Sequence, residues 1–480
     1  MGQIDNVRVV VVGGSAAGLF TSLLLARAGH EVVVLDRDPL EPARDVEDAA
    51  ESAFRAAAPQ IVQPHVVLSL CRELLLERLP DVYDDLVAAG VGQAPLSTQM
   101  APSLPDRSAW PGDERLALLM TRRATLDWVL RRAVAEQSGV TVRGGVAVTG
   151  LRARPGDPPY VTGVQSADGE LAADLVVDTT GRRSPIDRWL TAIDARPTAT
   201  VGAECGLAYY SRHYRLRTDS DLPGPTATRI VAGLDEFTVG IWGEDNSTMV
   251  CLIAPMADDK RFRAVRDPGV FTAVLRTVPI YAQWLDVLEP VTPIYPMGGL
   301  HNTLRRLVVD GTPVAYGLHA IGDTVCTTNP TLGRGLSLAL REAVDLVDAL
   351  ANGHDQPAEL ASVLHERVES QVAPFYDDQA AIDARRLAEL RHRIFDAPAP
   401  STPDAPDRVT YAQLRNAAPF DPAVFRAFWK VMGMVCLPET VYTDPEIVAR
   451  THEVIRTHGA GPPIAQPSRA DLLAALGQQP

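Results

Sequence analysis

The spacing of apolar residues near the N-terminus predicts a strand, a helix and a second strand. Residues 7–12 form a short, mostly apolar run, which is typical of a buried strand. Residues 16–28 have the length and composition of a helix, and Gly29 follows where helices commonly end. A second apolar run, 31–36, ends at Asp36. This order predicts a βαβ unit of the kind that binds nucleotides.

The pattern of apolar residues predicts further strands and helices as far as about residue 350. Apolar residues recur at helical spacing over 66–90 and 123–136, whereas 140–153 and 171–181 have the composition of strands. Between these strands, residues 160–170 are hairpin-like, with an Asp-Gly pair as the turn.

The pattern changes after about residue 200. Residues 237–255 predict an antiparallel hairpin of the sort that builds a sheet over a substrate. Residues 317–350 return to strand, loop and helix, and this helix is expected to end near Gly353. The remainder is mostly helical in pattern, apart from the proline-rich stretch 396–407, which is expected to be an exposed loop.

Composition excludes several classes of protein. The 480 residues are 46% hydrophobic and 22% charged, which suits a globular chain. The formal net charge of −15 argues against nucleic acid and anionic membrane surfaces as partners. The uncharged run 9–26 is interrupted by glycines and leads directly into another strand, so we expect neither a signal peptide nor a membrane span.

The cysteines point to a reducing compartment. They are widely separated and include no CxxC pair: Cys71, Cys205, Cys251, Cys326 and Cys436. Neither a disulfide framework nor a metal site is therefore expected, and we expect the protein to be cytoplasmic.

A glycine-rich turn joins the first predicted strand to the first predicted helix. It is a variant of GxGxxG with Ser15 in place of the middle glycine: Gly13-Gly14-Ser15-Ala16-Ala17-Gly18. Gly13 permits the tight turn, the small Ser15 lets the backbone approach a pyrophosphate, and Gly18 lets helix and strand pack closely. The helix N-terminus, at Ala16 and Ala17, attracts phosphates. Asp36 stands where an acid can bind ribose hydroxyls; the plain alternative is a structural glycine turn.

A second constellation lies at the end of the α/β region. A predicted strand ends at Gly322-Asp323, and a loop with Pro330 leads to Gly333 and Gly335, which open a long helix. This order predicts a second helix N-terminus directed at a ligand, with a carboxylate beside it. A nucleotide confined to the first motif has no need of this element, whereas a longer cofactor that crosses the domain does.

The spacing GD-x6-P-x2-G-x-G, together with the N-terminal dinucleotide motif, resembles the FAD-dependent monooxygenases of the aromatic hydroxylase superfamily. The resemblance implies that Asp323 binds a ribityl hydroxyl of the flavin. It also implies that Pro330 and the backbone from Gly333 through Gly335 to Leu336 face the flavin ring. Cys326 and Ser337 stand where the family commonly has His and Asn.

A third motif, DLVVDTTGRRSP (174–185), resembles the middle motif of the same superfamily. Gly181 and Ser184 match it, whereas Thr180 stands where Asp is usual. This variant is closest in style to flavin epoxidases and hydroxylases of polyketide and polyether biosynthesis.

Other cofactor contacts follow from the resemblance alone. Arg123-Ala124-Thr125-Leu126 resembles an Arg-x-x-Leu helix start at which the arginine contacts the cofactor, and Val148 falls where a strand backbone meets the adenine. Arg55 opens a stretch that resembles a loop running beneath the cofactor, and Arg37 follows Asp36. For Arg55 and Arg123 the alternative is an ordinary surface charge.

The expected fold is α/β, with a Rossmann-like FAD-binding domain, an inserted antiparallel-sheet substrate domain and a helical C-terminal region. The expected boundaries are 1–195 for the first part of the FAD-binding domain, 196–300 for the substrate domain, 301–355 for the return segment and 356–480 for the helical region. Tyr209, Tyr210 and Trp242 are candidates for the substrate chamber, with simple sheet core as the alternative.

The resemblance implies an FAD-dependent monooxygenase. In this family reduced flavin captures O2 as a C4a-hydroperoxide, which hands one oxygen atom to the substrate, here by epoxidation or hydroxylation of a hydrophobic small molecule such as a natural-product intermediate. The cofactor performs the oxygen chemistry, so no catalytic side chain is assigned. Electrons would come from NADPH or from a separate flavin reductase.

Three rival functions share this pattern. A flavin-dependent dehydrogenase or reductase, such as those acting on isoprenoids, and a non-redox FAD-containing cyclase both remain open. A halogenase typically carries Trp-x-Trp-x-Ile-Pro and a reactive lysine, and that motif is absent from the sequence. FAD is expected to be non-covalent, with attachment through Cys326 or His65 as the alternative.

Overall fold

The computed structural model describes residues 7–218, 220–221, 223, 229–245, 248–353, 356–400, 405–459 and 466–478. The predicted βαβ unit is present, with strand β1 at Arg8–Val12, helix α1 at Ala16–Arg27 and strand β2 at Glu31–Asp36. These strands belong to a five-stranded sheet of order β21-β10-β1-β2-β6, in which every neighbouring pair is parallel. The other strands are β6 (Val140–Gly144), β10 (Leu175–Asp178) and β21 (Leu318–Ala320).

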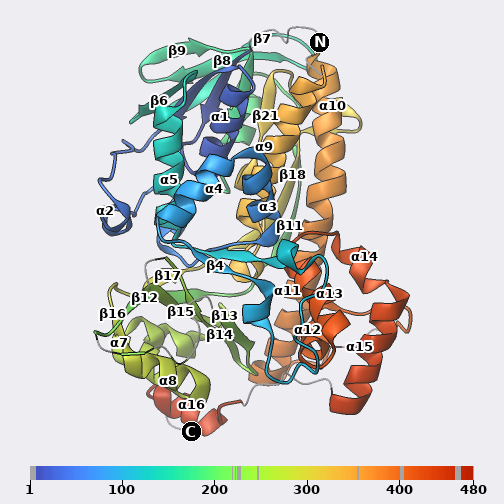
Figure 1. Cartoon of the computed structure of the whole chain (residues 1–480). Coiled ribbons are helices and arrows are strands. Elements are labelled where there is room, and N and C mark those ends of the chain that lie inside the picture. The colour runs from blue at the N-terminus through green and yellow to red at the C-terminus, as the bar shows by residue number, and fades with distance from the viewer. Residues whose placement is uncertain are drawn as a thin grey trace.

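The parallel sheet is covered on both faces, as its apolar strands require. Val9 and Val11 of β1 pack into a core with α1, α5 (Arg123–Glu136) and α9 (Gly335–Ala351). Val10 and Val12 face the other side, in a core that includes residues of a small antiparallel sheet. Its strands are β7 (Val148–Arg154), β8 (Tyr160–Ser166) and β9 (Gly169–Ala172), at the top of Figure 1.

A second, antiparallel sheet lies at the other end of the molecule (Figure 1). Its strands follow the order β13 (Arg229–Gly233), β14 (Phe237–Gly243), β15 (Thr248–Pro255), β12 (Tyr209–Leu216) and β16 (Leu288–Pro290), and β17 (Tyr295–Met297) also pairs with β12. Helices α7 (Pro268–Arg276), α8 (Pro279–Val287) and α16 (Arg469–Ala475) pack on it through one core. The predicted hairpin is β14 and β15; residues 246 and 247 lie outside the described residues.

Most of the remaining helices are C-terminal, and several lie beside the second sheet (Figure 1). They are α10 (Pro357–Arg367), α11 (Ala373–Phe395), α12 (Tyr411–Ala417), α13 (Pro422–Met432), α14 (Pro438–Tyr442) and α15 (Pro445–His458). Strands β11 (Ala199–Glu204), β18 (His301–Arg306) and β22 (Cys326–Thr327) form a three-stranded sheet. The predicted α/β class, with an antiparallel sheet and a helical C-terminal region, is confirmed. Of the expected loop 396–407, residues 401–404 lie outside the described residues.

The smaller elements complete the chain. They are α2 (Val46–Glu51), β3 (Val66–Val67), α3 (Ser69–Arg78), α4 (Pro80–Ala88), β4 (Gly92–Ala94), β5 (Leu118–Met120), α6 (Ile186–Ala192), β19 (Val308–Val309) and β20 (Thr312–Pro313). Strands β3, β5 and β4 form a three-stranded sheet in that order.

Three predicted elements are divided in the structure. The strand expected over 171–181 is split between β9, which ends at Ala172, and β10, which belongs to the parallel sheet. The helix expected over 66–90 is a short strand followed by α3 and α4, and the break falls before Pro80, which has no N–H to continue a helix. The strand expected over 140–153 is β6 and β7, which belong to different sheets. Between them Gly145 has φ +76°, a left-handed conformation that redirects the chain.

Within the described ranges, no helix combines the length and apolar character that crossing a bilayer demands. The same residues include no cluster of three or more His, Cys, Asp or Glu side chains arranged to hold a metal ion.

Candidate cofactor and substrate site

A single cavity of about 1720 Å³ connects the parallel sheet with the antiparallel sheet. Its wall includes the N-terminus of α1, the segment 63–66, the middle motif at 179–182 and the loop before α9. Nine predicted cofactor contacts lie in this wall: Ser15, Ala16, Ala17, Arg123, Asp323, Pro330, Gly333, Gly335 and Leu336. The other predicted contacts, Gly13, Gly18, Asp36, Arg37, Arg55 and Val148, do not line it.

The motifs meet because parallel strands end at the same edge of a sheet. Thr179, just after β10, donates its hydroxyl to the carbonyl oxygens of Val12 and Gly13 at 2.9 and 3.0 Å. The backbone N–H of Gly181 donates to the Thr324 hydroxyl at 2.8 Å. Three segments that are far apart in the sequence are thus joined at one place.

Only glycine fits the turn between β1 and α1. Gly13 has φ +116°, and a Cβ there would lie 2.8 Å from the carbonyl oxygen of Thr179. A Cβ on Gly18 would lie 1.8 Å from the carbonyl oxygen of Gly13, a distance that no contact tolerates. The chain therefore keeps the α1 N-terminus close to the edge of the sheet, where Ala16 and Ala17 line the cavity. This geometry fits a bound pyrophosphate.

Asp36, at the end of β2, is surrounded by donors from its own chain. Its Oδ2 accepts the N–H of Gly14 at 2.6 Å and Nη2 of Arg55 at 2.6 Å, and its Oδ1 accepts the N–H of Asp38 at 2.8 Å. Arg55 is buried, and it also donates to the carbonyl oxygen of Gly14 at 3.2 Å. Arg55 is therefore an internal ion-pair partner rather than a surface charge. Arg37 is exposed and donates to the carbonyl oxygen of Ala56 at 3.3 Å.

Arg123, the first residue of α5, connects this helix to the glycine-rich turn. Its Nη2 donates to the Ser15 hydroxyl at 2.8 Å, and its Nε donates to Asp127 at 2.7 Å. Arg123 is buried and lines the cavity, so it too is not a surface charge. Val148, by contrast, begins β7, and its side chain packs against the main hydrophobic core.

The middle motif is organised around Asp178, the buried last residue of β10. Its carboxyl accepts the N–H of Thr180 at 2.8 Å, the Thr180 hydroxyl at 2.6 Å and the hydroxyl of Ser184. Burial raises the pKa of Asp178, although these hydrogen bonds oppose the shift. Thr180, the residue that departs from the usual motif, thus holds the turn together.

Asp323 differs from Asp36 and Asp178 in its hydrogen bonding. It lies in the cavity wall after β21, and across the described part of the chain no group donates a hydrogen bond to its carboxylate. A Cβ on Gly335, at the start of α9, would lie 3.6 Å from its Oδ1. Burial raises the pKa of Asp323, and the nearby charges of Arg123 and Arg182 oppose that shift. An unpartnered acceptor beside a helix N-terminus fits a ligand hydroxyl, as a ribityl chain would supply.

The second sheet gives the cavity an apolar side. Tyr209, Trp242 and Leu252 line it, as predicted for the two aromatic residues. Tyr210 packs instead in the outer core with the helices that cover the sheet, because successive residues of a strand face opposite sides. The prediction for Tyr210 is therefore wrong.

The C-terminal helices supply site residues that the sequence pattern did not identify. Asp383 of α11 accepts hydrogen bonds from Asn302 at 2.8 Å and from Asn329 at 3.0 Å, and Tyr209 donates its hydroxyl to Asn329. Asn329 directly precedes Pro330, so this buried cluster fixes the loop expected to face the flavin ring. The helical periodicity of α11 showed no sign of this role, because the partners lie in distant segments.

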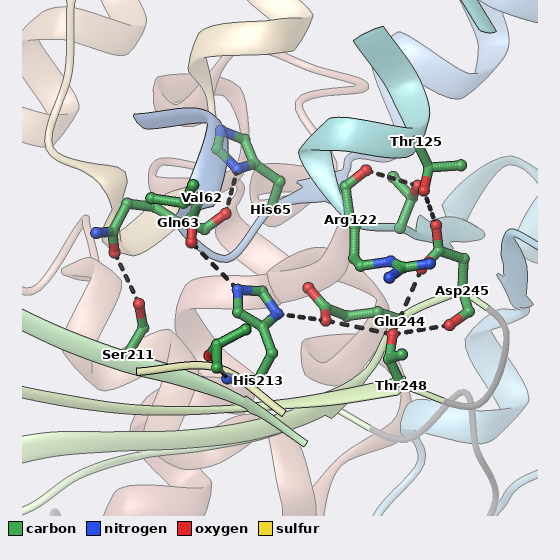
Figure 2. A network of polar contacts seen from close by, with 12 residues as sticks. Val62, Gln63, His65, Arg122, Thr125, Ser211, His213, Glu244, Asp245 and Thr248 are labelled. Atoms are coloured by element: carbon green, nitrogen blue, oxygen red, sulfur yellow. Dashed lines mark hydrogen bonds and ion pairs between the residues drawn. The ribbon is translucent and has the colours of Figure 1, made fainter. Parts of the chain in front are cut away.

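A further polar network lies beneath the segment 63–66 (Figure 2). His213 of β12 contacts Glu244 through Nδ1 at 2.8 Å and the carbonyl oxygen of Val62 through Nε2 at 3.1 Å. Burial alone would lower the pKa of His213, but the charge of Glu244 and these hydrogen bonds outweigh it and raise the pKa. No sequence motif marked this pair, since His213 lies on β12 and Glu244 follows β14.

The two alternative attachment points for flavin differ in position. Cys326 is buried and does not line the cavity, and burial raises the pKa of its thiol well above the usual range. His65 lines the cavity. Of the two, only His65 is positioned to contact a molecule bound there.

Comparison with known proteins agrees with the cofactor motif. Residues 6–42, which contain the glycine-rich turn, match the family described as FAD binding domain. The chain is 26% identical over 415 residues to Protein Rv3254 of Mycobacterium tuberculosis, covering 78% of this chain and 80% of that protein. It is 24% identical over 391 residues to the digeranylgeranylglycerophospholipid reductase of Haloferax volcanii, covering 77% of this chain and 83% of the reductase.

Solved structures share the fold over nearly the whole chain. The flavin-dependent brominase Bmp2 is 15% identical with a TM-score of 0.63, covering 94% of this chain and 99% of the brominase. The p-nitrophenol 4-monooxygenase PnpA from Pseudomonas putida is 15% identical with a TM-score of 0.53, covering 95% of this chain and 98% of that one. The FAD-binding family match at residues 6–42 and the fold shared with these structures agree with the likeness drawn from the motifs.

Proposed function

We propose that the chain is an FAD-dependent monooxygenase that inserts one oxygen atom from O2 into a hydrophobic small molecule, by epoxidation or hydroxylation. The observation that carries the proposal is the continuity of the cavity. The groups that suit FAD and an apolar wall on the second sheet line one cavity. A substrate in that cavity would lie against the cofactor and partly shielded from bulk water.

The residues of the chain would hold and orient the cofactor. Ser15, Ala16, Ala17 and Arg123 suit the pyrophosphate, and Asp323 suits the ribityl chain. The N-terminus of α9 presents partial positive charge at Gly335, which favours negative charge on a nearby group. When bound and reduced, FAD would supply the reactivity toward O2 that side chains lack.

The substrate class follows from the wall of the chamber. Apolar side chains dominate the part formed by the second sheet and its neighbours: Trp242, Leu252, Met297, Leu300, Phe425 and Trp429. Such a wall favours an apolar molecule, in keeping with a natural-product intermediate. The five free cysteines support a reducing, cytoplasmic setting.

The test supplies reduced FAD to the protein together with apolar candidate substrates under 18O2. Reduction by NADPH alone and by an added flavin reductase, in separate reactions, identifies the electron source. We expect one labelled oxygen atom in the product and none in an anaerobic control. Product without label would contradict oxygen insertion.

A flavin-dependent reductase is the second candidate, and the likeness to the Haloferax reductase favours it. A reductase transfers electrons to its substrate and needs no oxygen. Turnover that proceeds equally well without O2, with loss of a double bond from an isoprenoid substrate, would support this function.

Halogenation is disfavoured by the lysine content of the chain. The expected reactive lysine would have to contact the cavity, but the only lysines are Lys260 and Lys430. Neither lies in the wall of the cavity. We therefore expect no chloride- or bromide-dependent product.

A further inference from the structure

His65 lies in the cavity wall between the two cofactor motifs. Its neighbour Val66 approaches the α9 end, since a Cβ on Gly333 would lie 4.0 Å from the carbonyl oxygen of Val66. On the other side, the charges of Arg123 and Asp127 at the α1 end act on the imidazole. A cofactor that extends from one end to the other must therefore pass His65.

The structure fixes which ring nitrogen of His65 carries the proton. Nδ1 lies 2.8 Å from the carbonyl oxygen of Gln63, which can only accept a hydrogen bond. Nδ1 is therefore the protonated nitrogen. Burial, together with the charge of Arg123, lowers the pKa of His65 to about 4, so the ring is neutral at physiological pH. Nε2 then carries a lone pair and can accept a hydrogen bond.

That acceptor has no partner among the residues that the structure describes. Nothing in the described ranges hydrogen-bonds to Nε2 of His65, and the residue lines the cavity. Figure 2 shows the second ring nitrogen on the side of the ring away from Gln63 and the rest of the network. The ring thus directs its lone pair away from the groups that hold it.

The segment that carries His65 is fixed from below by the second sheet. Ser211 donates its hydroxyl to Oε1 of Gln63 at 2.9 Å, and Nε2 of His213 lies 3.1 Å from the carbonyl oxygen of Val62. Nδ1 of His213 lies 2.8 Å from Glu244, so both of its partners are oxygen acceptors, as an imidazolium requires (Figure 2). These contacts hold the backbone of residues 62–65 in place.

We propose that His65 is a cofactor-binding residue whose Nε2 accepts a hydrogen bond from a ribityl hydroxyl of FAD. The ribityl chain is the part of FAD between the pyrophosphate and the ring, and its hydroxyls are the donors on that stretch. Asp323 and His65 then divide these hydroxyls between them. The proposal rests on FAD binding in this cavity and not on oxygen insertion.

The experiment compares FAD with ADP, which lacks the ribityl chain and the ring, as ligands of the apoprotein. His65→Phe keeps a planar ring and removes the acceptor. We expect FAD to bind roughly two- to tenfold more weakly, the loss of one neutral hydrogen bond, while ADP affinity is unchanged. His301→Phe, at an exposed position outside the cavity wall, is the matched control and should change neither affinity.

Unchanged FAD affinity in His65→Phe would overturn the proposal, and so would an equal loss for ADP, which would mean a general disturbance. The wild-type protein gives a second readout that needs no variant. In 15N NMR spectra of histidine-labelled protein, FAD should shift the Nε2 resonance of His65 while Nδ1 stays protonated. An Nε2–H tautomer in the FAD complex would contradict the assignment. Neither readout involves O2, so a failed oxygenation assay leaves both intact.

Discussion

One carboxylate lies behind the α1 end of the cofactor cavity and another lies in its wall near α9, and their hydrogen bonding differs. Asp36, at the end of β2, receives hydrogen bonds from two backbone N–H groups and from Arg55. Asp323, after β21, receives none from the described residues, and burial raises its pKa. A partly buried carboxylate without a donor is unfavourable in the free protein, so its place in the cavity wall points to a ligand. The α1 end is thus completed by the chain, whereas the α9 end is left open for the cofactor.

Removing the Arg55 partner of Asp36 at the α1 end, the closed end, should reduce stability the most. Arg55→Met removes a guanidinium from a pair whose side chains are only 8% and 4% exposed. We expect the free energy of unfolding to fall by about 3–5 kcal/mol, because the Asp36 carboxylate stays buried without its counter-charge. Urea denaturation of the apoprotein measures this change.

Arg37→Met is the matched control for that measurement. Arg37 is the exposed arginine next to Asp36 and makes one hydrogen bond, to a backbone oxygen. Its removal should change stability by less than about 0.5 kcal/mol. Similar losses in both variants would show that the closed end is not held by the buried pair.

Overpacking the same end should reduce stability slightly less than Arg55→Met does. Gly18→Ala places a Cβ 1.8 Å from the carbonyl oxygen of Gly13, so β1 and α1 must move apart. We expect a loss of about 3 kcal/mol in stability and of bound flavin. Gly298→Ala is the control, since a Cβ there meets nothing within 4 Å. Thermal melting measures the stability of both variants, and flavin absorbance measures their bound flavin.

Asp323→Asn should weaken cofactor binding without weakening the fold. Asn keeps an acceptor oxygen but removes the charge that strengthens the hydrogen bond, which lowers FAD affinity by about 1–1.5 kcal/mol, or roughly five- to tenfold. Because burial raises the pKa of Asp323, its contribution to stability is lost as pH rises above the unfolded value. The Asn variant of the apoprotein should therefore gain stability relative to wild type between about pH 4 and 8. A loss of stability at neutral pH would contradict the open-end interpretation.

The smallest change in stability is expected for substitution of His213. Its pKa is raised by Glu244, so the stability contributed by the pair is present below about pH 6.5 and is lost as pH rises through the folded-state pKa. The melting temperature of His213→Gln should therefore fall furthest below that of wild type at pH 6 and approach it at pH 9. The exposed His301→Gln should show no such pH dependence. A constant difference across this range would assign His213 a packing role only.

Local pattern predicted the elements that are determined by nearby residues. The βαβ unit, the turn at Gly13 and the helix beginning at Gly335 depend on spacings within a few residues, and the structure has them where expected. The strand over 140–153 was predicted as one element because Gly145 bends the chain without interrupting its apolar pattern. For the same reason Tyr210 could not be assigned to a face before the register of β12 was known.

Contacts between residues that are far apart in the chain could not be predicted from the sequence. The contacts of Arg55 with Asp36, of Asp383 with Asn329 and of His213 with Glu244 each join residues from different elements. Their spacing along the chain carries no signal of these contacts. The three motifs at Gly13, Gly181 and Gly333 could be found because each is a local turn that contains glycine.

The flavin carried by the purified protein tests the central claim most directly, namely that the cavity between α1 and α9 holds FAD non-covalently. Heat should release FAD in a ratio of about one per chain, and the resulting apoprotein should regain its yellow colour with added FAD. Release of FMN, failure of the apoprotein to bind FAD, or flavin that stays attached after acid precipitation would contradict the account.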